Sequence, residues 1–281
     1  MIDLHVHTTM SDGTFSPSAV VDLAREKNLR AIAITDHDTV SGIPEAVEAS
    51  HGSGVEIIPG VEISGACDCG ILHILGYFVD HQDESLLSRL DYLRTQRKTR
   101  ISKILDKLLK NNVFVSEEDV LKESQGSSPG RPHLANILYQ NGYVKTRQDA
   151  FEKYLRKGAC AYVPKVKLDA GEAISLIRDA GGIAAIAHPH SLDINDPDKL
   201  TETIKSLVDM GLQAIEAFYP KHSPEQTKLF KDIANKLDLI VTGGTDFHGA
   251  NKPGIELGYF PDINHVPYDV VTNIKNMLLK T

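Results

Sequence analysis

Short apolar runs alternate with segments of helical periodicity along most of the chain. The runs cover residues 2–7, 29–34, 55–64, 71–78, 182–187, 212–219 and 237–242. Nearly continuous apolar strands separated by helices are typical of a mainly parallel sheet that is covered by helices. Six or seven such units favour a barrel over an open sheet. The pattern therefore predicts an α/β barrel in which the runs 55–64 and 71–78 are neighbouring strands.

Capping signals mark where several of the helices begin and end. Ser16 is suited to the position before a helix and Pro17 to its first turn. Ser223 and Gln226 have the spacing of a capping box before another helix. Gly211 follows a helical pattern at the point where a helix commonly ends.

The alternation is interrupted between residues 85 and 165. Regularly spaced leucine and isoleucine residues predict one long helix over about 84–111, and two further helices begin near Ser116 and Arg131. No strand run of comparable strength occurs there. We therefore expect residues 85–165 to form an all-helical insertion domain, and residues 1–84 and 166–281 to form one β/α barrel.

Charge is distributed unevenly between these two parts. The chain has a net charge of −8, yet residues 85–167 contain 17 Lys and Arg residues and only 8 Asp and Glu residues. An acidic body argues against a general nucleic-acid coat, and we expect no specific binding to DNA. The basic insertion could cover the site of an anionic substrate, although an ordinary solvated helix face explains the same charge equally well.

The sequence predicts a cytoplasmic protein that does not bind membranes. No apolar run reaches the roughly 20 residues that span a bilayer, and the N-terminus lacks the pattern of a signal peptide. The three cysteines do not suggest a disulfide framework, and we expect them to be reduced.

Acidic and histidine residues recur at or near the ends of the apolar runs. They are His5, His7, Asp12, Asp36, His37, Asp38, Glu62, His73, His188, His190, Glu216, Asp246 and His248. Barrel enzymes build their sites from the loops at the carboxyl ends of the strands. Since side chains alternate along a strand, His5 and His7 lie on the same face and can reach one ion. Imidazole and carboxylate groups together suit zinc, manganese or iron.

A structural role is the ordinary explanation for any one of these residues. A single buried histidine or acid is more often a hydrogen-bonded core residue than a ligand, and for Glu216 and His190 the two roles are evenly balanced. Five separate runs that end in ligand residue types are harder to explain without metal, because burying so many charges is unfavourable. A structural metal site would typically have four ligands and several cysteines. Metal-dependent hydrolysis is the better interpretation.

Together these motifs resemble the PHP family, the polymerase and histidinol phosphatase domain. The segments H-V-H-T, S-D-G, T-D-H-D, P-G-V-E-I-S, A-H-P-H and T-D-F-H-G occur in family order across almost the whole chain outside the insertion. The resemblance implies a distorted seven-stranded β/α barrel with a site for three divalent metal ions, with manganese favoured and zinc, iron or magnesium as alternatives. It places His5, His7, Glu62 and Asp246 at one ion; Glu62, His73 and His188 at a second; and Asp12, His37 and His248 at a third.

The segment G-R-P-H-L-A, residues 130–135, narrows the resemblance to a branch that acts on small nucleotides. In that branch Arg131 and His133 would bind a substrate phosphate, whereas an ordinary surface arginine before a helix is the alternative for Arg131. The implied function is a phosphatase that removes the 3′-phosphate of nucleoside 3′,5′-bisphosphates. The alternatives are a 5′–3′ exoribonuclease or oligonucleotidase acting on short 5′-phosphorylated RNA, and a non-catalytic structural PHP module.

Two further residues are expected to assist this hydrolysis. The leaving alkoxide needs a proton, and the candidates are His190 and a water molecule on the metal. Asp36 is adjacent to His37 in sequence, and we expect its carboxylate to orient an imidazole rather than to bind an ion.

Overall fold

The computed structural model describes residues 1–124, 129–261 and 265–280. The chain folds into two compact units, which are a barrel unit of residues 1–90 and 167–281 and a helical unit of residues 91–166. Helix α3 (Glu84–Leu109) begins in the barrel unit and continues into the helical unit.

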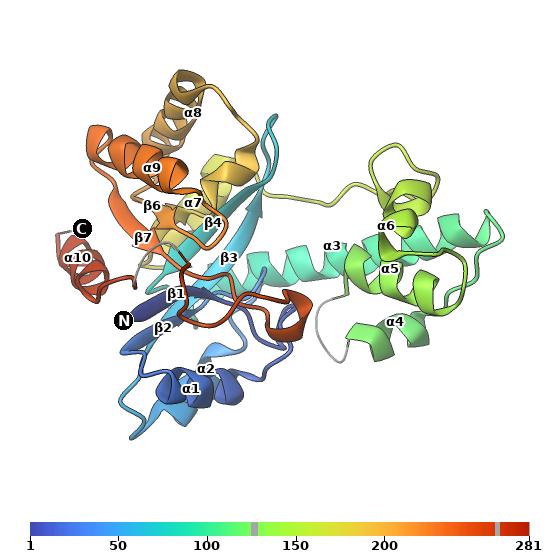
Figure 1. The fold of residues 1–281 in the computed structure, drawn as a ribbon, viewed down its shortest axis with the longest axis horizontal. Helices are drawn as coiled ribbons and strands as arrows, with labels where there is room; N and C mark the ends of the chain where they lie inside the picture. The colour runs from blue at the N-terminus through green and yellow to red at the C-terminus, as the bar shows by residue number, and fades with distance from the viewer. Residues whose placement is uncertain (125–128, 262–264, 281) are drawn as a thin grey trace. The chain divides into compact units, whose positions relative to one another are not determined.

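The barrel unit is built on one seven-stranded sheet in which the strands follow each other in chain order (Figure 1). They are β1 (Ile2–Val6), β2 (Ala31–Ile34), β3 (Glu56–Gly65), β4 (Leu72–Tyr77), β5 (Ile183–Ile186), β6 (Ala214–Phe218) and β7 (Ile240–Gly243). β4 is antiparallel to both of its neighbours, and the other pairs are parallel. The mainly parallel sheet predicted from the apolar runs is confirmed.

The two edges of this sheet meet immediately after β7. The amide of His7 donates to the carbonyl of Phe247 at 2.9 Å, and the amide of Phe247 donates to the carbonyl of His5 at 3.3 Å. Gly244 passes so close to β1 that a Cβ atom there would lie 2.3 Å from the Cβ of His5, which excludes any larger residue. The fold is a nearly closed seven-stranded barrel, and the predicted fold class is confirmed.

Asp3 fastens β1 to the segments that follow β7. Its buried carboxylate accepts hydrogen bonds from the amide and hydroxyl of Thr245, from the amide of Gly258 at 2.8 Å and from the amide of His5 at 3.2 Å. The two oxygens of the Asp3 carboxylate thus accept four hydrogen bonds, so this buried group is satisfied. These hydrogen bonds support the closure of the barrel.

Helices that lie within the barrel unit cover the outside of the sheet (Figure 1). They are α1 (Pro17–Glu26), α2 (Ile43–Ser50), α7 (Ala170–Asp179), α8 (Pro197–Asp209), α9 (Pro224–Lys236) and α10 (Asp269–Leu278). The hydroxyl of Ser16 accepts from the amide of Ala19 at the start of α1, and Ser223 and Gln226 form the capping box of α9. The capping signals in the sequence therefore mark true helix starts.

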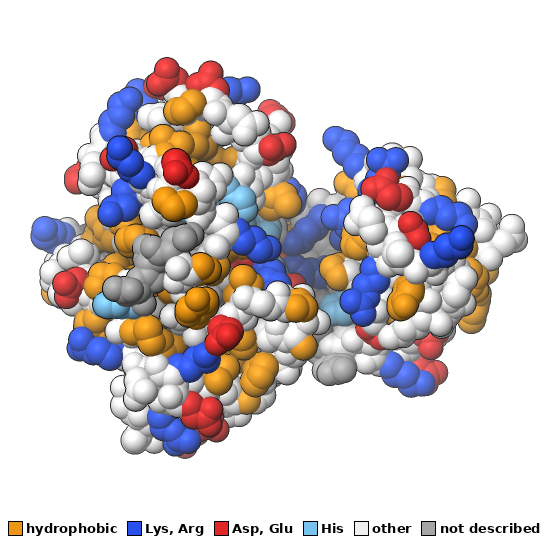
Figure 2. Space-filling model, viewed as in Figure 1, with side chains coloured by type: hydrophobic (Ala, Val, Ile, Leu, Met, Phe, Trp, Pro, Cys, Tyr) orange, Lys and Arg blue, Asp and Glu red, His pale blue; other side chains and the backbone are white. Residues whose placement is uncertain are grey.

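The helical unit packs α4 (Glu117–Ser124), α5 (Arg131–Gln140) and α6 (Arg147–Ala150) around the carboxyl-terminal part of α3. Its core includes the fully buried Ile104, Leu108, Leu134 and Leu138. Lys and Arg side chains are prominent on its visible surface (Figure 2). Within the described ranges, no helix of either unit is long and apolar enough to cross a bilayer.

Two of the cysteines lie against each other. The sulfur atoms of Cys67 and Cys69 are in contact in the turn between β3 and β4. Cys160 is a free, exposed cysteine in the helical unit.

Candidate metal centre

Glu62 of β3 is the point on which five imidazole rings converge. One of its oxygens, Oε2, lies 3.0 Å from Nδ1 of His37, 3.1 Å from Nε2 of His7 and 3.3 Å from Nε2 of His5. His5 lies in β1 and His7 directly follows it on the same face, as period-two alternation requires, and His37 follows β2. The three rings come from neighbouring strands, so the sheet itself sets their spacing.

The other oxygen of Glu62 faces two more rings. Its Oε1 lies 2.7 Å from Nδ1 of His73 and 3.1 Å from Nε2 of His188. His73 lies near the amino-terminal end of β4 rather than the carboxyl-terminal end. Because β4 is antiparallel to β3 and β5, that end lies beside the carboxyl ends of its neighbours. The reversed strand thus brings His73 to the same end of the barrel.

Asp246 supplies a second carboxylate to the His5 and His7 pair. Its Oδ1 lies 3.5 Å from Nε2 of His5 and 3.3 Å from Nε2 of His7. Its other oxygen accepts a hydrogen bond from the hydroxyl of Tyr219 at 3.0 Å and contacts the ammonium group of Lys252. One oxygen is therefore held by the protein, and the other faces the imidazoles.

Asp12 forms a third acidic corner next to His248 and His37. Its Oδ1 lies 3.2 Å from Nε2 of His248, and its Oδ2 lies 3.9 Å from Nε2 of His37. The nitrogen Nδ1 of His248 donates to the backbone carbonyl of Asp246 at 2.8 Å, which leaves Nε2 for the centre. This corner joins the loop after β1 to the loop after β7.

Three groups of these side chains could each hold a metal ion, with the ligand atoms of a group within 4.8 Å of one another. They are His5, His7, Glu62 and Asp246; His37, Glu62 and His73; and His7, Asp12, His37 and His248. The first group is the set that the family resemblance implies. The second contains His37 where the sequence placed His188, and the third also includes His7. All nine residues expected as ligands meet in this one place.

Buried polar atoms without hydrogen-bond partners support metal binding here. Within the described residues, such atoms include Nε2 of His5, Nε2 of His7, Oδ1 of Asp12, Nδ1 of His37 and Oε2 of Glu62. An unsatisfied buried polar atom is unfavourable, and native proteins contain few of them. Five that converge on one point fit divalent ions as their missing partners.

The electrostatics of the centre favour ionised carboxylates. Burial by itself raises the pKa of Glu62, but the imidazoles of His37 and His73 hold that pKa well below its usual value. Burial by itself lowers the pKa of His7, but the carboxylates of Asp246 and Glu62 raise it to about 9. The carboxylates therefore remain available to a cation, and a proton on His7 occupies a position that a metal ion would take.

Polar groups outside the centre orient its imidazoles. Nδ1 of His5 donates to Glu216 at 2.9 Å, and the other oxygen of Glu216 accepts from the backbone amide of His188 at 2.6 Å. Nδ1 of His188 in turn donates to the hydroxyl of Ser191 at 2.9 Å. Each contact directs Nε2 of the ring toward Glu62. Glu216, which the sequence left open, thus holds two candidate ligands in place and belongs to none of the three groups.

Asp36 reaches the centre through the loop that follows β1. Its carboxylate accepts from the amide and hydroxyl of Thr8, both at 2.7 Å, and from the hydroxyl of Ser11 at 2.6 Å. The same Ser11 hydroxyl lies 3.3 Å from Nδ1 of His7. The described contacts thus lead from Asp36 to His7 through Ser11.

His190 lies beside the centre and is bonded to a second histidine. It occupies the 3₁₀ turn Pro189–Leu192, and its ring centroid is 6.2 Å from that of His188 and 5.3 Å from that of Tyr219. Its Nδ1 lies 3.0 Å from Nε2 of His222.

Three residues of this neighbourhood escaped the sequence analysis, namely Tyr219, His222 and Lys252. Tyr219 directly follows β6, so the rule that strand ends carry the site would have found it if phenols had been considered with acids and imidazoles. His222 and Lys252 come from loops, and no periodic signal marks them. Their positions follow from chain packing alone.

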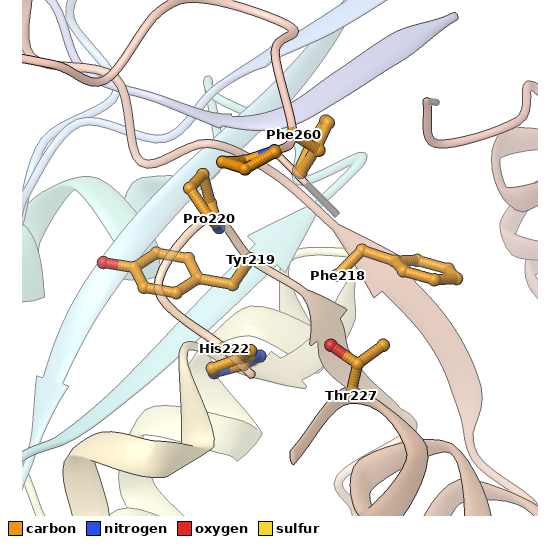
Figure 3. A pocket seen from close by; sticks show the side chains of 7 residues that line it. Phe218, Tyr219, Pro220, His222, Thr227 and Phe260 are labelled. Carbon is orange, nitrogen blue, oxygen red and sulfur yellow. The ribbon is translucent and has the colours of Figure 1, made fainter. Parts of the chain in front are cut away.

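His222 and Tyr219 also line a small recess beside β6 (Figure 3). The side chains of Phe218 and Tyr219 point in opposite directions, as expected for successive residues at a strand end. The ring of His222 lies close to that of Tyr219, with centroids 5.0 Å apart.

The two expected phosphate-binding residues belong to the helical unit, at the start of α5. The guanidinium of Arg131 donates to the carbonyl of Leu155 at 3.2 Å. Nδ1 of His133 accepts from the backbone amide of Gly130 at 3.0 Å. In neutral His133 the ring proton therefore resides on Nε2.

Residues 3–166 match the sequence model of the PHP domain. The chain belongs to the PHP family. It is 34% identical over 258 residues to the 5′-3′ exoribonuclease Rnm of Salmonella typhimurium, which covers 91% of this chain and 87% of that protein. It is 30% identical over 263 residues to a 3′,5′-nucleoside bisphosphate phosphatase of Chromobacterium violaceum, which covers 93% of this chain and 92% of that protein.

A solved PHP-like structure agrees with this assignment. A crystal structure from Bifidobacterium adolescentis, of a protein described as a candidate metal-dependent phosphoesterase, superimposes with a TM-score of 0.82 at 33% identity. The match covers 97% of this chain and 94% of that one. With its buried histidine and carboxylate groups, this PHP protein is a metal-dependent phosphoesterase. A non-catalytic structural module is therefore excluded.

Proposed function

We propose that this PHP protein hydrolyses a phosphomonoester of a small nucleotide. The substrate that we propose is a nucleoside 3′,5′-bisphosphate, from which the enzyme removes the 3′-phosphate. The observation that carries the proposal is the convergence of eight imidazole and carboxylate residues in three groups at one end of the barrel, with His188 as a ninth against Glu62. Among the described residues, five buried atoms of this centre lack hydrogen-bond partners. The named activity of the Chromobacterium relative supports the choice of substrate.

We further propose that the nine residues hold three divalent ions, with manganese favoured. They are His5, His7, Asp12, His37, Glu62, His73, His188, Asp246 and His248. A mixed set of imidazole and carboxylate ligands suits manganese, iron or zinc. When bound, such ions supply a nucleophile at neutral pH and neutralise the charge that develops on the phosphoryl oxygens.

Arg131 and His133 are proposed to bind a substrate phosphate. A guanidinium binds phosphate through paired hydrogen bonds, and Nε2 of neutral His133 can donate another. Burial and the nearby charge of Arg131 lower the pKa of Arg100 to about 10. In the described part of the chain, no carboxylate forms an ion pair with Arg100 or Arg131. Two cations near each other without an acid favour an anionic ligand.

The remaining chemical requirement is a proton for the leaving alkoxide. His190 lies within 6.2 Å of His188, measured between ring centroids, and is one candidate donor. A water molecule at the centre is the other. Asp36 is proposed to assist by holding the Ser11 hydroxyl beside His7.

A second function is supported by the relative from Salmonella. That protein is named a 5′-3′ exoribonuclease and is 34% identical to this chain. The basic helical unit also carries the exposed aromatic residues Phe114 and Tyr139, on which bases could stack. Short 5′-phosphorylated RNA is therefore the competing substrate.

Phosphate release from adenosine 3′,5′-bisphosphate, beside nucleotide release from a short 5′-phosphorylated RNA, tests the two functions. With manganese present, we expect the bisphosphate to have the higher kcat/KM. Asp246→Ala should lower kcat/KM by at least a hundredfold, because it removes a ligand of the centre. A higher kcat/KM for RNA would replace the first function with the second, and full activity of Asp246→Ala would refute the metal assignment.

Arg131→Ala tests the phosphate-binding proposal separately. A charge-assisted hydrogen bond contributes about 1.5–3 kcal/mol, so we expect KM for the bisphosphate to rise by roughly tenfold or more. KM for adenosine 3′-monophosphate should change much less, since that substrate lacks the second phosphate. Arg156→Ala is the matched control, because Arg156 is exposed in the same unit and pairs with Glu152. Equal effects on both substrates would place Arg131 at the 3′-phosphate, and an unchanged KM for the bisphosphate would contradict the assignment.

A further inference from the structure

His190 and His222 form a hydrogen-bonded pair beside the metal centre, and neither belongs to the three ligand groups. His222 lies in the loop between β6 and α9 with only 3% of its surface exposed. Its ring is enclosed by Tyr219 and Phe230, with centroids 5.0 and 4.7 Å away. A ring packed in this way has little freedom to turn.

The backbone determines which nitrogen of His222 carries its proton. Nδ1 of His222 lies 2.9 Å from the carbonyl oxygen of Ala217. A carbonyl oxygen can only accept, so Nδ1 must be the donor. In the neutral ring Nε2 is then an unprotonated acceptor.

The direction of the second hydrogen bond follows from the first. Nε2 of His222 accepts, so Nδ1 of His190 must donate across the 3.0 Å contact. Nε2 of neutral His190 consequently has a lone pair and no proton. His190 has no further hydrogen bond in the described part of the chain, and its ring is only partly buried. The lone pair is therefore accessible to a ligand.

The rings of His5 and His188 show the same arrangement. Each donates from Nδ1 to a protein oxygen and directs Nε2 to the centre. His190 repeats this pattern with an imidazole as its acceptor. Nε2 of His5 and of His188 faces Glu62, whereas in the described part of the chain no carboxylate contact is found for Nε2 of His190.

We propose that His222 is a positioning residue that holds His190 in the Nδ1–H tautomer and so makes Nε2 of His190 a hydrogen-bond acceptor beside the phosphoesterase centre. The ligand is an O–H donor, from a substrate hydroxyl or a water molecule. The assignment of the tautomer does not depend on the identity of the substrate. The suggestion that a substrate hydroxyl is the donor rests on the proposed nucleotide function.

Nitrogen NMR of the wild-type protein labelled with ¹⁵N-histidine tests the tautomer directly. The two ring nitrogens differ in chemical shift according to which one is protonated, and the His190→Ala spectrum identifies the signals of His190. We expect His190 to carry its proton on Nδ1. In His222→Phe, which keeps an aromatic ring but has no acceptor, the proton should redistribute to Nε2. A wild-type His190 protonated on Nε2 would overturn the proposal, whatever the substrate proves to be.

A double-mutant cycle tests whether His222 acts through His190. We expect His222→Phe to lower kcat/KM about tenfold in wild type, and to cause no further loss in the His190→Ala background. His222→Gln retains a hydrogen-bond acceptor, so it should keep most of the activity. If His222→Phe does not fold, the near-normal activity of His222→Gln and the NMR assignment of the wild-type tautomer are the remaining tests. His51→Ala, which changes an exposed histidine, is the control. Losses that simply add would refute the coupling.

Two substrates distinguish the sources of the O–H donor. If a substrate hydroxyl is the donor, His222→Phe raises KM for the nucleotide and leaves p-nitrophenyl phosphate unaffected. If water is the donor, kcat falls for both substrates. Unchanged kinetics on both, with normal manganese content, would show that His222 has no role in the reaction.

Discussion

At the scale of single residues, the outer nitrogens of the imidazoles matter as much as the inner ones. Glu216 accepts from Nδ1 of His5 and from the amide of His188, and so fixes two candidate ligands with one carboxylate. Glu216 is fully buried. Its two hydrogen-bond donors come from β1 and from the segment after β5. Such a residue affects metal binding without contacting an ion.

Glu216→Gln should weaken manganese binding by about tenfold to a hundredfold. The amide group of Gln can accept through one atom only, so either the His5 or the His188 hydrogen bond is lost. Isothermal titration calorimetry measures the affinity, and Glu225→Gln on the surface of α9 is the matched control. An unchanged affinity would show that Glu216 does not orient the ligands.

At the scale of elements, strand direction decides where each side chain arrives. The parallel strands place their candidate ligands at or near their carboxyl ends, and the sequence pattern was sufficient to predict that grouping. β4 places His73 near its amino-terminal end, and only its antiparallel pairing brings this residue to Glu62. The register between β3 and β4 also decides the position of Glu62. This residue lies inside β3, opposite Leu75 of β4, and not in the loop after a strand.

Asp3 accepts hydrogen bonds from the segments that follow β7, and its removal should destabilise the barrel. Asp3→Ala leaves the buried amides of Thr245 and Gly258 without acceptors, so we expect the free energy of unfolding to fall by about 3 kcal/mol. Urea denaturation measures this change. Asp22→Ala on the exposed surface of α1 should change it by less than about 0.5 kcal/mol. Equal stability of the two variants would mean that Asp3 does not support the closure.

At the scale of the whole molecule, metal binding and folding should be coupled. Candidate ligands come from β1, β3 and β4 and from the segments after β1, β2, β5 and β7, so an ion at this centre joins distant parts of the barrel. Free ligand at a hundredfold its Kd stabilises a protein by about 2.7 kcal/mol.

Removal of metal should therefore lower Tm. We expect a chelator to reduce Tm of the wild-type protein by roughly 5–10 °C, and added manganese to restore it. Differential scanning calorimetry makes the comparison, with Asp246→Ala as a variant whose Tm responds less to either addition. A wild-type Tm that is indifferent to both would mean that no stabilising ion binds.

The sequence by itself determined the class of fold, the helix starts at Ser16 and Ser223, and which histidine and acidic residues gather at one end of the barrel. These follow from local periodicity, capping and strand direction, which are properties of neighbouring residues. Only the tertiary structure decided that Glu62 is central, that Glu216 orients His5 and that His222 pairs with His190. These contacts join segments up to 211 residues apart, and their geometry depends on strand register and loop packing, which no local pattern encodes.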